Sequence, residues 1–64
     1  MTEKDRDKFE ELFKTEVHDK GHEVDPANEL DWYVLTVGWA IGKGIKPEDA
    51  HDFSRYIRYH TDLG

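Results

Sequence analysis

The feature that most constrains the fold is a ten-residue segment without a charged side chain, WYVLTVGWAI at residues 32–41. If the segment is helical, apolar side chains cover nearly its whole circumference, and a helix of that kind is buried. Asp25-Pro26 suits the start of such a helix, because Asp accepts free backbone N–H groups and Pro has none to satisfy. We therefore predict a central helix over about residues 26–42.

The same segment is rich in aromatic and β-branched residues, which favour strands, and a short apolar run cannot be assigned from periodicity alone. A strand over residues 32–41 is the alternative to the helix. A lone strand in a 64-residue chain would, however, need a partner from a second chain. The helix is preferred for this reason and because of the Asp-Pro start.

Two apolar stripes run along the predicted central helix, and we expect each to contact one flanking helix. The first comprises Leu30, Tyr33, Val34, Val37 and Ile41, and the second comprises Trp32, Leu35 and Trp39. Gly38 and Gly42 would let a neighbouring backbone come close to this helix.

Two further helices are predicted on either side, over about residues 3–20 and 47–61. Thr2 can cap the first and Gly21 can end it, while Pro47 suits the first position of the second. Their inner stripes are Phe9, Leu12, Phe13 and Val17 in one, and Ala50, Phe53 and Ile57 in the other. The sequence therefore predicts an all-α fold, a three-helix bundle forming one domain over residues 1–64.

The core of this bundle must form by apolar packing alone. The chain has no cysteine, which excludes disulfides, Cys-type zinc sites and thiol chemistry. Leu, Ile, Val and Phe supply only 14 of the 64 residues. The eight aromatic residues must therefore serve the core first, because each can bury on the order of 150–250 Å².

The net charge of −6 lies entirely in residues 1–31, which hold 11 acids and 5 bases, whereas residues 32–64 hold 4 of each. One interpretation is a solvated face that keeps the domain soluble. The other is an anionic surface that steers the chain to a basic partner and repels nucleic acid. The acids assigned to this partner-binding face are Glu10, Glu11, Asp19, Glu23, Asp25, Glu29 and Asp31.

Surplus aromatic residues could hold such a partner. Trp32 and Trp39 lie two helical turns apart and belong to the core if the third helix covers them. If the bundle leaves them uncovered, they form with Tyr59 an aromatic patch of the kind found at interaction hot spots. That patch would serve a different protein or a homodimer.

The last third of the chain supports an alternative, nucleic-acid binding. Its cations and an adjacent aromatic ring could hold a phosphate backbone and stack a base: Lys43, Lys46, Arg55, Arg58 and Tyr59. Carboxylates at Glu48, Asp49 and Asp52 oppose this, since they occupy the turn where a recognition helix would meet bases. In the simpler interpretation, the two arginines balance the acids of the first helix.

Metal-binding and catalytic motifs are weak or absent. His18 and His22 are four residues apart and could bind zinc or nickel on a continuous helix, but Gly21 between them should end the helix. No nucleophile elbow, phosphate loop or dinucleotide fingerprint occurs in the sequence. We therefore expect no cofactor, no metal and no enzymatic activity.

These features favour a small acidic protein-binding module. Its sharpest form is an inhibitor that occupies the basic groove of a nucleic-acid-handling protein, by analogy of size and charge with small acidic proteins of phages and mobile elements. The apolar run is far short of the roughly 20 residues that cross a bilayer, and the N-terminal residues lack a leader pattern. We expect no membrane association and a cytoplasmic location.

Overall fold

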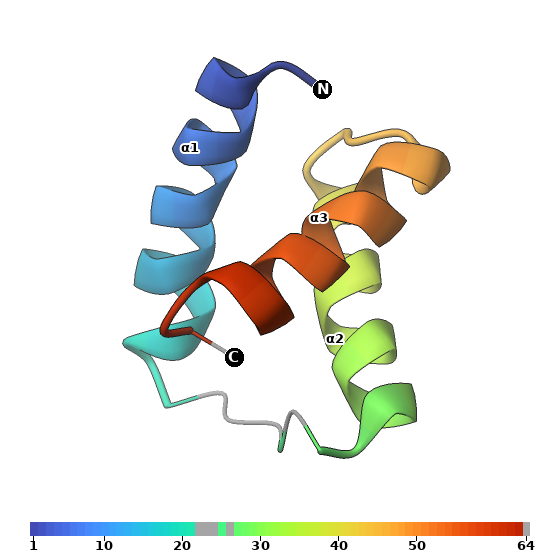
Figure 1. Ribbon diagram of the computed structural model, residues 1–64. Helices are drawn as coiled ribbons and strands as arrows, with labels where there is room; N and C mark the ends of the chain where they lie inside the picture. Colours follow the sequence, from blue (N-terminus) through green and yellow to red (C-terminus); the bar gives the residue numbers. More distant parts are fainter. Residues whose placement is uncertain (22–24, 26, 64) are drawn as a thin grey trace.

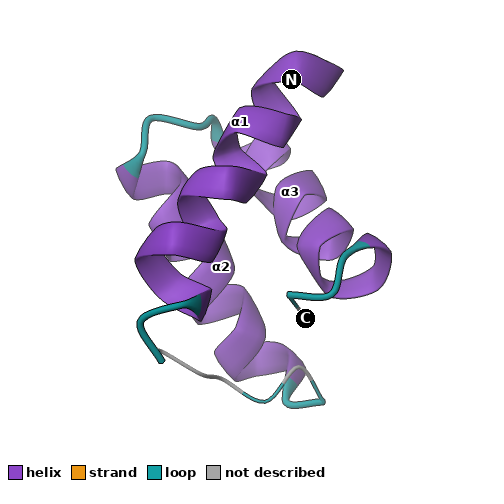
Figure 2. Ribbon diagram, turned by 90° about the vertical axis from the view of Figure 1, so that its left-hand side faces the viewer, coloured by secondary structure: helices purple, strands orange, loops and turns teal. Residues whose placement is uncertain are grey.

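A computed structural model describes residues 1–21, 25 and 27–63. In these parts of the chain it contains helices α1 (Glu3–Phe13), α2 (Glu29–Gly42) and α3 (Pro47–His60), with a π-helical turn, η1 (Lys14–His18), continuing α1. Helices α1 and α2 stand on either side of the molecule, and α3 crosses in front of α2 toward α1 (Figures 1 and 2). The all-α three-helix prediction is confirmed, and the strand alternative is wrong because residues 32–41 are helical throughout.

The predicted signals act at several helix ends. The Thr2 side chain accepts a hydrogen bond from the Asp5 N–H at 3.1 Å, and Pro47 occupies the first turn of α3. Gly21, with a φ of 73°, follows η1, and Gly44, with a φ of 91°, joins α2 to α3. Both glycines adopt the left-handed conformation that side-chain-bearing residues disfavour, so they fix the two connections.

Helix α2 begins at Glu29, three residues later than predicted. Asn28 is its cap, since its side-chain oxygen accepts from the Asp31 N–H at 3.3 Å. Asp25 instead accepts from the Ala27 N–H at 2.9 Å, which forms a turn before the helix. Pro26, the predicted first residue of this helix, lies outside the described residues.

The ends of α1 and α3 also differ from the prediction. The first helix was expected to stay regular to residue 20, but its last turn is wider, with the Asp19 N–H donating to the Lys14 carbonyl five residues back at 2.8 Å. At the end of α3, Thr61 is extended and its hydroxyl donates to the Ile57 carbonyl at 2.6 Å. This side-chain bond ends the helix at His60, one residue early.

Phe13 is the centre of the core. Its ring contacts Trp32, Trp39 and Phe53 edge-on, with ring centroids 6.2, 5.3 and 6.3 Å away. These rings belong to α2 and α3, so a single side chain of α1 joins all three helices. The buried apolar residues are Phe13, Val17, Trp32, Ala40, Ile45, Ala50, Phe53 and Ile57.

Helix α2 buries the face that lies between its two predicted stripes and leaves most of the first stripe exposed. Trp32, Thr36 and Ala40 face inward, whereas Leu30 is 73% and Val34 70% exposed. The prediction that each stripe contacts a different helix is therefore wrong. Helix α1 packs on the tryptophan side, where Phe13 meets the indole rings. Helix α3 contacts Trp39 through Phe53 and also reaches Tyr33 of the first stripe, whose ring centroid lies 6.0 Å from that of His51.

A polar seam lies where α2 crosses α3. The Trp32 indole N–H donates to the Ser54 carbonyl at 3.2 Å, and the Thr36 hydroxyl donates to the Trp32 carbonyl at 2.7 Å. The hydroxyls of Thr36 and Ser54 are also hydrogen-bonded to each other, and both residues are fully buried. Small side chains at the crossing let the two backbones approach closely, and the hydrogen bonds satisfy the buried polar groups.

We predict that the Thr36 and Ser54 hydroxyls contribute non-additively to stability. Thr36→Val should lower the free energy of unfolding by about 1–3 kcal/mol, because it leaves the buried Ser54 hydroxyl without its partner, and Ser54→Ala by about 0.5–1.5 kcal/mol, because the Thr36 hydroxyl keeps its bond to the Trp32 carbonyl. The double variant should lose less than the sum, by about 0.5–3 kcal/mol. Urea unfolding followed by circular dichroism measures this, with Thr15→Val on the exposed side of η1 as the control; strict additivity would contradict the prediction.

Candidate functional site

The residues predicted to form the anionic face do not all point outward. Glu11 and Asp19 are exposed, but Glu10 faces α3, where the Tyr56 hydroxyl donates to its carboxylate at 2.7 Å. Glu10 is therefore part of the packing between α1 and α3, which corrects its assignment to the partner-binding face. Glu23 lies outside the described residues.

The strongest anionic feature surrounds the start of α2. We define the acidic pole as Asp25, Glu29 and Asp31, which are all exposed. It lies at the lower end of the molecule in Figure 1. The sequence from residue 21 to residue 42 contains no Lys or Arg, so no cation of this segment offsets the pole. Glu29 and Asp31 lie in the first turn of α2, at the positive end of the helix dipole.

Local contacts hold the carboxylates of the pole in place. The Asn28 amide donates to Asp31 at 2.8 Å, and the Asp25 side chain accepts from the Ala27 N–H. Arg58 of α3 lies 3.4 Å from Glu29, whose side chain is nevertheless 68% exposed. The pole is therefore an ordered group of charges rather than a set of free side chains.

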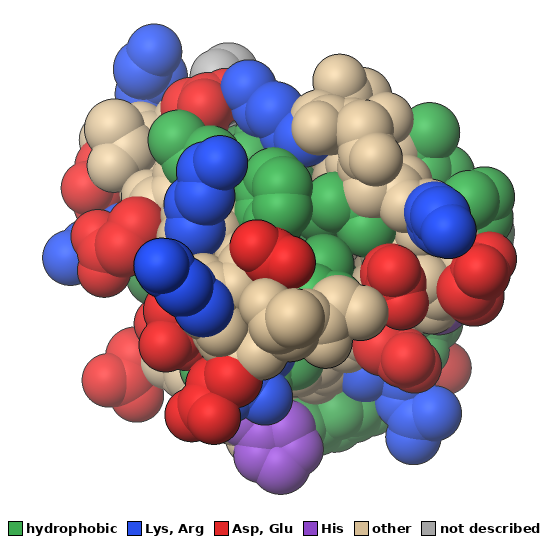
Figure 3. Space-filling view, turned by 90° about the horizontal axis from the view of Figure 1, so that it is seen from above, with side chains coloured by type: hydrophobic (Ala, Val, Ile, Leu, Met, Phe, Trp, Pro, Cys, Tyr) green, Lys and Arg blue, Asp and Glu red, His purple; other side chains and the backbone are tan. Residues whose placement is uncertain are grey.

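The outer face of α1 is less one-sided. Residues 3–13 hold five acids and three bases. Seen from above, Lys and Arg side chains lie among Asp and Glu side chains on the left of the molecule, where α1 runs (Figure 3). Opposite charges at such short spacing offset one another, so α1 contributes less to a directed negative field than the acidic pole does.

The predicted aromatic patch does not form. Trp32 is 2% exposed, and Trp39 is half-buried against Phe53, with ring centroids 5.9 Å apart. Tyr59 alone of the three is well exposed, on α3. The two tryptophans serve the core, because Phe13 and Phe53 supply aromatic partners for them on the inner side of α2.

The predicted cationic residues are not gathered on one free face. Lys43 pairs with Glu16 at 2.5 Å, and Arg58 pairs with Glu29 while its guanidinium lies 5.0 Å from the Tyr59 ring centroid. Lys46 caps α3 and Arg55 is exposed. Two of the four cations proposed for nucleic acid are thus already placed against carboxylates.

The Glu16–Lys43 pair joins the end of α1 to the end of α2. The Lys43 ammonium donates to the Glu16 carboxylate and holds its pKa below the ordinary value of 4.5, with the Trp39 indole N–H and the charge of Lys20 acting in the same direction. The pair stabilises the folded chain only while Glu16 is ionised.

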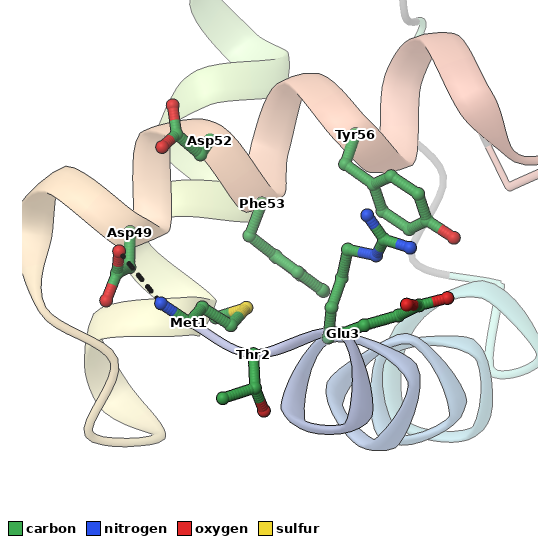
Figure 4. A pocket seen from close by; sticks show the side chains of 8 residues that line it. Met1, Thr2, Glu3, Asp49, Asp52, Phe53 and Tyr56 are labelled. Atoms are coloured by element: carbon green, nitrogen blue, oxygen red, sulfur yellow. Dashed lines mark ion pairs between the residues drawn. The ribbon is translucent and has the colours of Figure 1, made fainter.

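A pocket of about 400 Å³ opens between the N-terminal residues and α3 (Figure 4). Asp49 lies 3.5 Å from the Met1 amino group, and the Arg6 guanidinium stacks 4.2 Å from the centroid of the Tyr56 ring. The hydrogen bond to Glu10 raises the pKa of Tyr56 above its ordinary value of 10.0, so the phenol stays protonated at neutral pH. Positive groups and carboxylates share the lining, and their charges do not select a ligand of one sign.

The histidines do not form a metal site in the part of the chain that the structure describes. His18 is exposed and hydrogen-bonds to Asp19 at 3.2 Å, while His22 falls outside the described residues. Within residues 1–21, 25 and 27–63, no three His, Asp or Glu side chains gather as metal ligands would. Over the same residues, no helix has both the length and the apolar character of a membrane span.

Comparison with protein-family models, curated proteins and solved structures finds no match to this chain. A function must therefore be proposed from the surfaces of the molecule itself. Among these surfaces the acidic pole stands out, because its carboxylates are exposed and its own segment of the chain contains no Lys or Arg.

We predict that Glu16→Gln lowers the thermal unfolding midpoint at neutral pH, because it removes the negative partner of Lys43. A lowered pKa in the folded state stabilises the protein above the ordinary pKa, and this contribution is lost as the pH falls below about 4.5. The difference between wild type and variant should therefore shrink in acid. Calorimetry across that range measures it, with Glu11→Gln as the exposed control; a difference that is independent of pH would contradict the prediction.

Proposed function

We propose that the chain is a non-enzymatic protein-binding module whose acidic pole engages a basic surface of another protein. The observation that carries the proposal is the grouping of three exposed carboxylates in a segment without Lys or Arg. A negative field of this kind raises the rate of encounter with a positively charged partner and repels nucleic acid.

The sharper form of the proposal is an inhibitor that occupies the nucleic-acid-binding groove of its partner. Such grooves present Lys and Arg to a row of phosphates. Asp25 and Asp31 are held by hydrogen bonds, so little side-chain freedom is lost when they meet these cations. Glu29 is 68% exposed, so solvent screens its pair with the mostly buried Arg58. The pair is worth about 0–1 kcal/mol, which leaves Glu29 free to exchange its cation for one of the partner.

We predict that neutralising the pole weakens partner binding. The triple variant Asp25→Asn, Glu29→Gln, Asp31→Asn keeps the shape of each side chain and one acceptor oxygen in each while it removes three charges. Proteins retained by the wild-type chain from a lysate of its source should be basic, and the strongest of them should bind the variant about tenfold more weakly. Titration calorimetry at two salt concentrations measures the loss, which should be smaller at high salt.

A matched control removes the same charge elsewhere. Asp7→Asn, Glu48→Gln and Asp62→Asn change exposed carboxylates outside the pole and should leave affinity nearly intact. DNA or RNA should also compete with the chain for the partner. Equal losses in the two triple variants, binding that ignores salt, or simultaneous binding of nucleic acid would each count against the inhibitor.

A further inference from the structure

An apolar seam runs along the outer face of α2. We define the outer seam as Leu30, Val34, Val37 and Ile41, of which Leu30, Val34 and Ile41 are exposed and Val37 is half-buried. Their spacing of four, three and four residues is that of the a and d positions of a coiled coil. The helix therefore presents to solvent the pattern that usually packs against another helix.

The described residues cover the outer seam only at Val37, which packs against the core, and leave Leu30, Val34 and Ile41 exposed. Helix α1 packs on the tryptophan side of α2, and the far side of α2 faces away from α1 (Figure 1). Leu30, Val34 and Ile41 are three of the five large apolar side chains that remain exposed in the described structure. Their exposure to water is unfavourable, and contact with another apolar surface would relieve it.

Two glycines lie beside the seam. A Cβ added at Gly38 or Gly42 would meet no atom within 4 Å, and neither residue has a positive φ. Glycine in the interior of a helix is destabilising relative to alanine, so Gly38 carries a penalty for which the described residues show no structural return. A bare backbone at this point does, however, permit a neighbouring helix to approach closely.

We propose that the outer seam is a self-association surface, on which α2 of a second copy packs antiparallel. In an antiparallel pair, a positions of one helix meet d positions of the other. Leu30 of one copy then lies against Ile41 of the other, and Val34 lies against Val37. The seam is thus complementary to itself about a two-fold axis near its middle, as a symmetric dimer requires.

The charges at the ends of α2 select the antiparallel direction. The acidic pole surrounds the N-terminal end of the helix, whereas Lys46 and Lys43, the latter already paired with Glu16, follow its C-terminal end. An antiparallel pair places the pole of one copy beside the lysines of the other and opposes the two helix dipoles. A parallel pair would instead set the two poles together.

The interface predicted in this way is small. A helix of 14 residues is about 21 Å long. One such helix from each copy gives an interface at the lower end of the range for specific complexes, below about 1,200 Å² in total. The dimer is therefore expected to form and dissociate with protein concentration.

Sedimentation equilibrium of the full chain, from about 10 μM to about 1 mM, tests the proposal. The average mass should rise from monomer toward dimer, and Val34→Glu should weaken association at least tenfold. Tyr59→Glu, at a position on α3 that is 59% exposed against 70% for Val34, is the matched control and should associate like the wild type. Gly38→Ala provides a second variant that favours the helix, and it should raise the unfolding midpoint of the dilute chain while weakening the dimer.

Cross-linking tests the direction, because the natural chain has no cysteine. An equimolar mixture of Leu30→Cys and Ile41→Cys chains should oxidise mainly to the mixed disulfide. A wild-type chain that stays monomeric at the highest concentration would overturn the proposal, and so would unchanged association of both Val34→Glu and Gly38→Ala. Preferential disulfide formation between two Leu30→Cys chains would overturn the antiparallel arrangement.

Discussion

The position of α1 depends on one side chain, Phe13. The backbones of α2 and α3 lie close together where the two helices cross. The backbone of α1 lies farther from both, and α1 contacts them mainly through its side chains. The Phe13 ring meets aromatic rings of both other helices, and three edge-on contacts of this kind fix its place in three directions. The Glu10–Tyr56 hydrogen bond and the Glu16–Lys43 pair then hold α1 and its continuation against the other two helices on either side of this cluster.

The same core geometry creates the outer seam. The tryptophan face of α2 attracts Phe13 from α1 and Phe53 from α3, and the small residues Thr36 and Ala40 let α3 lie close. Neither neighbour covers Leu30, Val34 or Ile41, and no further helix is left in the described residues to do so. An apolar helix that a longer chain would bury on all sides is buried here on one side only.

The sequence predicted where helices begin and end better than it predicted which side of each helix points into the core. Thr2, Gly21 and Pro47 act through the backbone of their own segment, so their roles could be predicted without tertiary structure. The buried side of α2 could not be predicted in this way, because the helix has two apolar stripes. Which side is buried depends on where Phe13 and Phe53 lie in the folded chain. The Thr36–Ser54 seam was missed for the same reason, since each hydroxyl is acceptable in the core only opposite the other. Among the candidate site residues, exposure of the acids followed from charge alone, but Glu10 was misplaced because its bond to Tyr56 spans two helices.

The two proposed surfaces meet on α2, and their physical properties make them competitors. The acidic pole would bind the basic surface of a partner, yet in an antiparallel dimer the same pole lies beside Lys43 and Lys46 of the second copy. In the dimer, lysines of the second copy already pair with the carboxylates of the pole. The carboxylates therefore gain less free energy from a cation of another protein, because that cation must first displace these lysines. Self-association would therefore lower the affinity for a basic partner by mass action, and dilution would restore it. Such competition needs no conformational change, since both contacts use side chains that the core of a single chain already holds in place.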